Sequence, residues 1–440
     1  MNRRPARAAD GGFRRAPSAL ILAALLGVSA TCETAFAQPR TNDSPFTLSA
    51  AVERALGANP QLASLRAKWE ALQERPKQAK ALPNPMLSYG GMDMADGGEW
   101  PDTNEKRIML EQGFPWFGKR ALREGIADKD AEVMRREFEA MARDVVQRVK
   151  ENFYELAALQ RVIAITREEE TVLLRMVKVA EARYATGGGS QADVIKAQTE
   201  ITMLKQKLLE FQAQENTLKA KLNTLLDRRA DEPLAPLERP PEAGLPAEAG
   251  TLFADAAKNR PEILAAQAQI ERYRLEEKLM EKERLPDYRL GLEYRGIDSQ
   301  EDMLMFTVSV DLPIWQAKYR AGVREAEKMR ESSEAARAAA ERQSAFDVQD
   351  AHFKLLTARR TLGLYRDELV PQAEARFNAS EAGYRAGKVD FLDLLESQRF
   401  LLNTRVMTAM AEGTLGMQAA RLERAVGLGI SGSASAADSK

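Results

Sequence analysis

The feature that most constrains the fold is a stretch that occurs twice, 200 positions apart. The first copy reads YATGGGSQADVIKAQ from Tyr184, and the second reads YRAGKVDFLDLLESQ from Tyr384. The copies match without a gap at four pairs: Tyr184/Tyr384, Gly187/Gly387, Asp193/Asp393 and Gln198/Gln398. Because each copy places a glycine turn between two long helical patterns, the sequence predicts a duplicated helical hairpin, and the repeat fixes the unit of architecture.

The helices on either side of these turns are predicted to be very long. Residues 119–185 contain no proline and one glycine, so all 67 can form a single helix of roughly 100 Å. Residues 316–382 are the counterpart, interrupted only by Gly363, Pro371 and one earlier glycine. With the returning helices, the predicted hairpins span 119–226 and 316–426. Their apolar residues recur every three and four positions, a coiled-coil-like pattern that requires neighbouring helices.

Four short segments alternate between apolar and polar residues. The pattern predicts strands at 86–94, 105–113, 288–296 and 303–312, most clearly in the second pair, and a period of two gives each strand one apolar and one polar face. Strands of this length suit a tilted membrane strand, and the two faces are typical of a barrel with a wet lumen. Each pair ends in a proline-aromatic corner. Trp116 and Trp315 there indicate either a membrane interface or a packed helix N-terminus.

The N-terminal residues indicate export. Five arginines precede an apolar run at 19–30, and Ala35-Phe36-Ala37 follows, so residues 1–37 are predicted to be a signal peptide. Cys32 raises lipidation as an alternative, although Ser29-Ala30-Thr31 is a poor lipidation motif. No later apolar run approaches the ~20 residues of a membrane helix. Strands are therefore expected to make any membrane crossing.

Composition narrows the function classes. The net charge of −1 gives no reason to expect nucleic acid as a partner. The chain has one histidine, His352, and one cysteine, so we expect no His/Cys metal site, no internal disulfide and no cofactor. Without a phosphate loop or a nucleophile beside a base, we expect no enzyme.

The segments follow in a regular order. We expect a first repeat at 38–226, a Pro-rich linker at 227–250 and a second repeat at 251–428. The small, polar residues 429–440 are expected to form a disordered tail.

Four strands cannot close a barrel, and an open edge in lipid leaves backbone groups unpaired. A trimer would supply twelve strands. The expected fold is therefore mainly α with a β-barrel portion: long coiled-coil hairpins in an α-barrel and four transmembrane strands per chain, closed by the trimer into a 12-stranded barrel.

In these features the sequence resembles the outer membrane efflux protein (TolC) family. The resemblance is carried by the signal peptide, the opening LSAAVERALGANPQL, the duplicated strand–strand–helix–helix plan and the two Y-x-x-G turns followed by aspartate. It implies a homotrimeric outer membrane channel with a periplasmic tunnel. Such a channel docks on a periplasmic adaptor (membrane fusion protein) and an inner membrane pump of the RND type, or on a type I secretion transporter.

The resemblance also implies roles for the turns. The positions that correspond to the adaptor-docking tip are Tyr184, Gly187, Tyr384, Gly387 and Lys388, and those that correspond to the tip constriction are Asp193 and Asp393. Tyr384 also matches a tyrosine that ties neighbouring hairpins together. Val389 stands where family members with a tight closing salt bridge carry arginine, and Lys388 is a neighbour that can substitute. Ordinary helix capping, with glycine at the C-terminus and aspartate near the next start, is the alternative.

The cargo that the resemblance implies, metal cations or small toxic compounds passed from the periplasm or cytoplasm to the outside, is less constrained. The corner at 114–119 resembles members that accompany heavy-metal pumps. Methionines fall in the strand regions, where thioethers suit soft cations, although flexible packing is the more common use of methionine; they are Met86, Met92, Met94, Met109, Met303 and Met305. Acids in the loops between strands suit a cation-attracting mouth or plain solvated charge; they are Asp96, Glu99, Asp102, Asp298, Glu301 and Asp302.

Two different functions also fit part of the sequence. The first is a type I protein-secretion conduit, which would share the strands and the hairpins with an efflux channel. The second is a non-channel periplasmic coiled-coil protein, which would account for the helices and leave the alternating strands unexplained.

Overall fold

The computed structural model describes residues 45–92, 105–240, 249–297 and 301–427. Several predictions fall outside these ranges: the signal peptide with Cys32, strand residues 93–94, the acids Asp96, Glu99, Asp102 and Asp298, and the tail 429–440. Among the described residues, no helix is both long and apolar enough to span a membrane.

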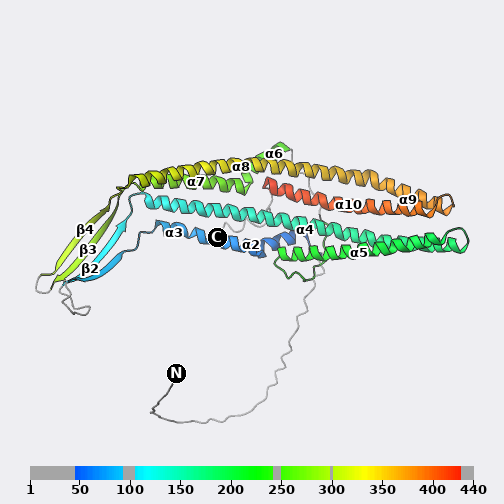
Figure 1. Ribbon diagram of the computed structural model, residues 1–440, viewed down its shortest axis with the longest axis horizontal. Coiled ribbons are helices and arrows are strands. Elements are labelled where there is room, and N and C mark those ends of the chain that lie inside the picture. The colour runs from blue at the N-terminus through cyan, green and yellow to red at the C-terminus, as the bar shows by residue number, and fades with distance from the viewer. Residues whose placement is uncertain (1–44, 93–104, 241–248, 298–300, 428–440) are drawn as a thin grey trace, which may run out of the picture. The chain divides into compact units, whose positions relative to one another are not determined.

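The described chain opens with three short helices, α1 (Leu48–Ala58), α2 (Pro60–Gln73) and α3 (Arg75–Lys80) (Figure 1). The Asn59 side chain accepts hydrogen bonds from the backbone N–H groups of Gln61 and Leu62, and Pro60 takes the first position of α2. Asparagine before a helix and proline at its first position both favour a helix start. This pair therefore ends α1 and begins α2.

Four strands form one antiparallel sheet in the order β1-β2-β3-β4. Their bounds are β1 Met86–Met92, β2 Glu105–Phe114, β3 Asp287–Ile297 and β4 Met303–Asp311. The two repeats join at β2–β3, where Leu110 lies opposite Leu292 and Met109 opposite Glu293. β1 and β4 are left as the edges of the sheet.

The sheet has two unlike faces. The apolar sheet face consists of side chains that are 43% to 71% exposed: Leu87, Tyr89, Ile108, Leu110, Leu292, Tyr294, Leu304, Phe306, Val308 and Val310. The charged sheet face carries residues linked by cross-strand ion pairs: Glu105, Arg107, Glu111, Arg289, Glu293, Arg295 and Asp311. An exposed apolar surface of this extent marks an interaction site, with lipid or with protein.

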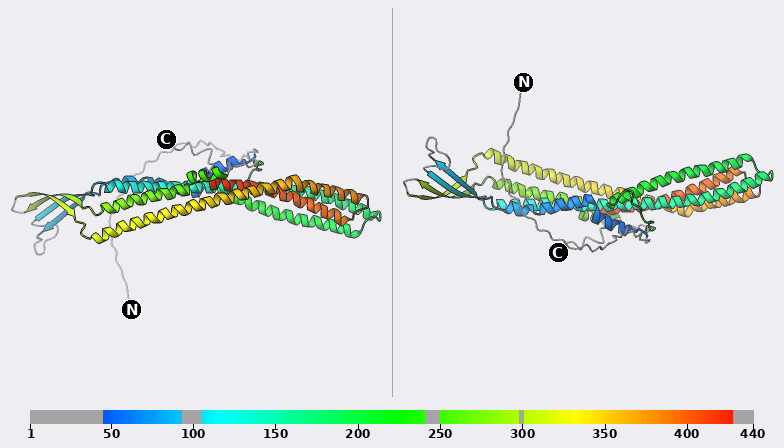
Figure 2. Two further views of the ribbon diagram at one scale, coloured as in Figure 1. Left: turned by 90° about the horizontal axis from the view of Figure 1, so that it is seen from above. Right: turned by 90° about the horizontal axis from the view of Figure 1, so that it is seen from below.

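The remaining helices run alongside one another (Figures 1 and 2). They are α4 Lys119–Ala185, α5 Gln191–Leu225, α6 Ala249–Asn259, α7 Pro261–Lys282, α8 Gln316–Gly363, α9 Val370–Arg385 and α10 Phe391–Val426. α4 packs against α5, α7 and α10. Its 67 residues separate the sheet at one end from the hairpin turns at the other by roughly 100 Å.

The second long helix is not broken at Pro371. A π-helical turn, Leu364–Leu369, connects α8 to α9 without a gap. Proline lacks an N–H, and its ring collides with the carbonyl four residues earlier in a regular α-helix. The wider π turn relieves this conflict just before the proline.

Small residues let α10 approach α4 closely. A Cβ placed on Gly416 would lie 2.2 Å from the Tyr154 ring, and one on Gly413 would lie 2.5 Å from Ala158.

The expected fold class, long helical hairpins with four strands per chain, is confirmed.

Candidate functional site: the hairpin tips

The two hairpins turn with the same hydrogen bonds. Gly187 and Gly387 have φ angles of +76° and +70°, in the left-handed region that glycine adopts without steric cost. Each glycine N–H donates to the carbonyl of the tyrosine three residues earlier at 3.1 Å, and the next N–H donates to the carbonyl five residues earlier at 2.9 Å. This is the Schellman arrangement, which satisfies carbonyls at the end of a helix.

The two aspartates lie at the starts of the returning helices. The Asp193 N–H donates to Ser190 Oγ and the Ser190 N–H donates to the Asp193 carboxylate, both at 3.3 Å. This reciprocal pair is a capping box. The Asp393 N–H donates to the Asp390 carboxylate at 2.9 Å, so Asp390 is the capping residue of the second hairpin. The Asp193 side chain is half-buried and that of Asp393 is exposed.

The two tyrosines differ sharply. Tyr184 is 50% exposed, whereas Tyr384 is 4% exposed. Arg183 Nη1 donates to the Tyr384 carbonyl oxygen at 2.7 Å, and the Arg183 guanidinium carbon lies 4.5 Å from the centre of the Tyr384 ring, a cation–π contact. The Phe391 ring packs edge-on at 5.7 Å. Burial raises the pKa of the Tyr384 phenol above 10.0, and the charge of Arg183 opposes the shift.

Arg183 was missed by the sequence reasoning. It ties the first hairpin to the second within one chain, and the signal that pointed to it is the difference between the copies at this position, Arg183 against Gly383. A Cβ on Gly383 would lie 2.5 Å from Val389 Cγ2, so valine packs where the second copy has no side chain. Lys388 is exposed beside it. The arginine that contacts Tyr384 therefore comes from the first hairpin.

A buried polar pair lies behind the turns. Gln398 Nε2 is 2.6 Å from both carboxylate oxygens of Glu169, and the two residues are 3% and 5% exposed. Burial raises the pKa of Glu169 to about 7, although the hydrogen bond from Gln398 acts in the opposite direction. The pair links α4 to α10. Gln198, the repeat counterpart of Gln398, is exposed.

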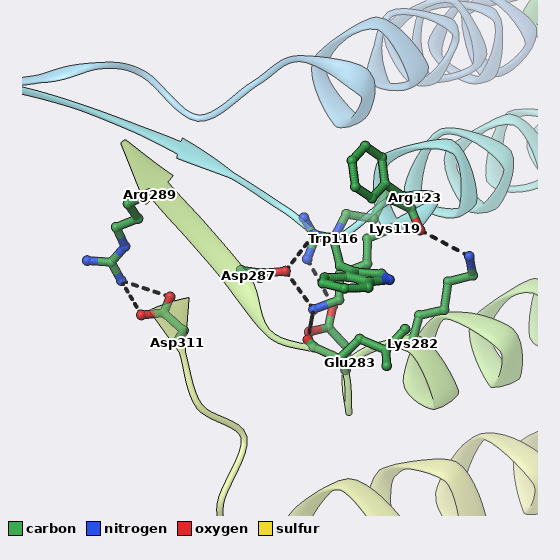
Figure 3. Close-up of polar contacts among 10 residues, drawn as sticks. Trp116, Lys119, Arg123, Lys282, Glu283, Asp287, Arg289 and Asp311 are labelled. Carbon is green, nitrogen blue, oxygen red and sulfur yellow. Dashed lines mark hydrogen bonds and ion pairs between the residues drawn. The ribbon is translucent and has the colours of Figure 1, made fainter. Parts of the chain in front are cut away.

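At the other end of α4, a charged junction joins the helices to the sheet (Figure 3). Lys119 is 1% exposed, and its Nζ lies 2.8 Å from Asp287 Oδ1 and 3.4 Å from Glu283 Oε2. The Trp116 N–H also donates to Asp287 Oδ1, at 2.7 Å. Trp116 is half-buried at this helix start, whereas Trp315 is 73% exposed. The junction fixes the direction in which α4 leaves the sheet.

Known proteins share this sequence pattern and this architecture. The chain is 25% identical over 393 residues to the cobalt-zinc-cadmium resistance protein CzcC of Cupriavidus metallidurans, covering 88% of this chain and 92% of that protein. The fold is similar to that of CusC, with a TM-score of 0.76 and 16% identity over 87% of this chain and 92% of that one. It is also similar to the outer membrane protein VceC from Vibrio cholerae, with a TM-score of 0.72 and 19% identity over 87% and 96% of the two chains.

The family model of the outer membrane efflux protein matches residues 51–228 and 252–428. The two matched segments each contain one strand pair and one helical hairpin. The chain therefore belongs to the outer membrane efflux protein family.

Proposed function

We propose that three copies of this chain form the outer membrane channel of a tripartite efflux system that exports metal cations. In this proposal the channel works with a periplasmic adaptor and an inner membrane RND-type pump. Family membership supplies the outer membrane location and the role in efflux. The observation that carries the rest is the sheet: it has one apolar face, one charged face and two open edges, at the opposite end of α4 from the turns.

The open edges support assembly, because unpaired backbone groups in lipid cost several kcal/mol each. The β2–β3 pairing within the chain offers a template for pairing β4 with β1 of the next copy. To transfer this register, Pro115 after β2 is aligned with Pro313 after β4, and Pro83 before β1 with Pro286 before β3. Val310 then lies opposite Leu87 of the next copy, and Asp311 lies opposite Met86. This register keeps both sheet faces continuous across the junction. Three copies would close twelve strands.

The proposed cargo rests on the curated relative. CzcC is named for resistance to cobalt, zinc and cadmium, which supports metal cations as cargo. A protein-secretion conduit has no comparable support, and a periplasmic coiled-coil role leaves the exposed apolar sheet face without a use.

The turns are proposed to meet the adaptor. Tyr184, Gly187, Gly387 and Lys388 are exposed and fit direct contact, whereas the buried Tyr384 would support the turn from inside. Asp193 and Asp393 are proposed to lie near the tip constriction; the capping box already occupies the Asp193 carboxylate. The Schellman hydrogen bonds account for the two glycines as helix ends, and the proposed partner contact adds a second reason for a turn without side chains.

Bulk at Gly187 tests this assignment. A Cβ built there meets no atom of the chain within 4 Å, so the cost of a side chain within the chain is the strain of the left-handed backbone, and added bulk points away from the chain. Gly187→Leu should abolish cobalt, zinc and cadmium resistance in cells that carry the cognate pump, while the heat-modifiable trimer stays in the membrane. Gly187→Ala is the matched control, because alanine carries the same cost of the left-handed conformation and adds only one carbon.

Two results would count against the proposals separately. Full resistance with Gly187→Leu would remove the tip assignment and leave the channel intact. A deletion strain as resistant to these metals as its parent, or a monomeric membrane protein, would refute the channel function itself.

A further inference from the structure

We propose that the charged sheet face carries a thioether site for a soft monovalent cation, formed by Met303 and Met305 of β4 with Met109 of β2. The inference rests on the proposed channel, in which this face lines the passage. Neither the family nor the names of the relatives assign a metal site to the sheet.

The strand register places these methionines together. Met109 lies opposite Glu293 on β3, and Glu293 lies opposite Met305 on β4, so the three residues form one row across the sheet. Met303 is two positions from Met305 on the same strand and therefore projects from the same face, with roughly 7 Å between the two positions. Two flexible thioethers at that spacing can reach a single ion between them.

Met109 extends over β3 toward β4. A Cβ on Gly291 would lie 3.0 Å from Met109 Cε and 3.6 Å from Thr307 Cβ on β4. Gly291 therefore leaves a gap on β3, and the end of the Met109 side chain occupies it. Thr307 is two positions beyond Met305, on the side away from Met303, so the third thioether approaches β4 beside Met305.

Packing does not explain this placement. Methionine is commonly used to fill irregular gaps in a core. Met303 and Met305, however, are 42% and 43% exposed and lie on the charged face, beside ion-paired arginine and glutamate. The apolar sheet face is built instead from leucine, valine, isoleucine, phenylalanine and tyrosine. Exposed thioethers on the wet side gain little from burial.

The neighbouring charges favour a soft ion over a hard one. The Glu293 carboxylate lies 3.1 Å from both Arg107 Nε and Arg295 Nη2, so its charge is already neutralised. In the described parts of the chain, no group of three or more His, Cys, Asp or Glu side chains is arranged to hold a metal. Neutral thioethers select Cu(I)-like ions over zinc or cobalt. A few thioethers without a charged ligand would bind weakly enough to release the ion, as conduction requires.

Silver(I) is a suitable probe, because it has the same charge and ligand preference as Cu(I) and no redox chemistry under these conditions. Purified trimer labelled with ¹³C at the methionine methyl groups is titrated with silver nitrate in chloride-free buffer. The methyl resonances of Met109, Met303 and Met305 should shift together at low silver. The double variant Met303→Leu/Met305→Leu keeps the side-chain volume nearly constant. In equilibrium dialysis its affinity for silver should be lower than that of the wild type by about tenfold or more.

The matched control is Met203→Leu/Met407→Leu, which removes two methionines of α5 and α10 that are 52% and 48% exposed. This variant should bind silver as the wild type does. Equal affinity in the β4 double variant, or silver shifts confined to helical methionines, would overturn the site. If the double variant does not assemble, the single variant Met305→Leu takes its place and should also bind silver more weakly than the wild type.

Cell assays separate the site from the proposed function. The β4 double variant should lower silver tolerance at least about fourfold and leave cobalt, zinc and cadmium resistance unchanged. If silver tolerance stays at the wild-type value, the thioether site is refuted and the channel stands. If the wild type itself gives no metal resistance, the proposed function fails instead.

Discussion

Replacing Glu169 by glutamine removes a buried carboxyl group from the region behind the tip. Glu169 lies in α4, roughly 25 Å from the turn at Gly187, and its carboxylate oxygens are both 2.6 Å from Gln398 Nε2. The pKa of Glu169 is raised to about 7, chiefly by burial and to a smaller extent by the charge of Glu200, although Gln398 and Arg405 act to lower it. Glutamine has nearly the same shape and does not ionise.

The magnitude follows from the shift. Raising the pKa from 4.5 to about 7 means that ionising Glu169 costs the folded state up to about 3 kcal/mol, at 1.36 kcal/mol per unit. Because the folded-state pKa lies above the unfolded one, the stabilisation by the neutral carboxyl is complete below pH 4.5 and is lost as the pH rises through about 7. Gln398 Oε1 is buried without a hydrogen-bond partner. A protonated Glu169, or a glutamine there, can donate to it once the amide turns.

The assay compares the thermal midpoint of the purified trimer at pH 4 and pH 8.5, at one scan rate. Glu169→Gln should match the wild type at pH 4 and melt a few degrees higher at pH 8.5. Glu168→Gln, a change at the exposed neighbour, should show no such difference. Identical pH profiles for the wild type and Glu169→Gln, or a lower midpoint for the variant at pH 8.5, would refute the reasoning.

Three further changes probe the contacts between the repeats. Arg183→Ala should raise the closed-state conductance in planar bilayers, because it frees the second hairpin from the first. Arg385→Ala removes only an exposed ion pair within one helix and should leave the conductance unchanged. Equal conductance of the two variants would contradict the proposed role of the Arg183–Tyr384 contact. Lys119→Met should lower the stability of the folded chain by about 2–3 kcal/mol. This is less than the usual loss for a broken buried pair, because the two carboxylates are partly exposed. A thermal midpoint equal to that of the wild-type trimer would show that the junction is unimportant. Gly416→Ala should cost about 1–3 kcal/mol through its collision with an aromatic ring, and Gly57→Ala, which meets no atom within 4 Å, should leave the midpoint unchanged or slightly raised.

The sequence predicts the elements of this fold well for identifiable reasons. The 67-residue helix follows from the absence of proline, and the clear alternation at Tyr288–Tyr294 follows from the two unlike sheet faces. Pro371 misled the helix prediction, because a π turn upstream is not visible in residue periodicity.

The contacts between the repeats lie beyond sequence reasoning. Arg183 with Tyr384 and Glu169 with Gln398 are separated by about 200 residues, and each pair depends on how two helices are rotated against each other. The methionine row depends on strand register, since a slip of one residue would move Met109 to the other face. Neither quantity is written in local periodicity.

The unequal tyrosines have a consequence for stoichiometry. One hairpin of each chain presents a half-exposed Tyr184, and the other keeps Tyr384 inside under Arg183. In the proposed trimer, the six tips therefore alternate between two kinds. A partner that contacts the exposed tyrosine finds three equivalent places and not six, so the number of partner subunits that bind alike is set by the chains and not by the hairpins.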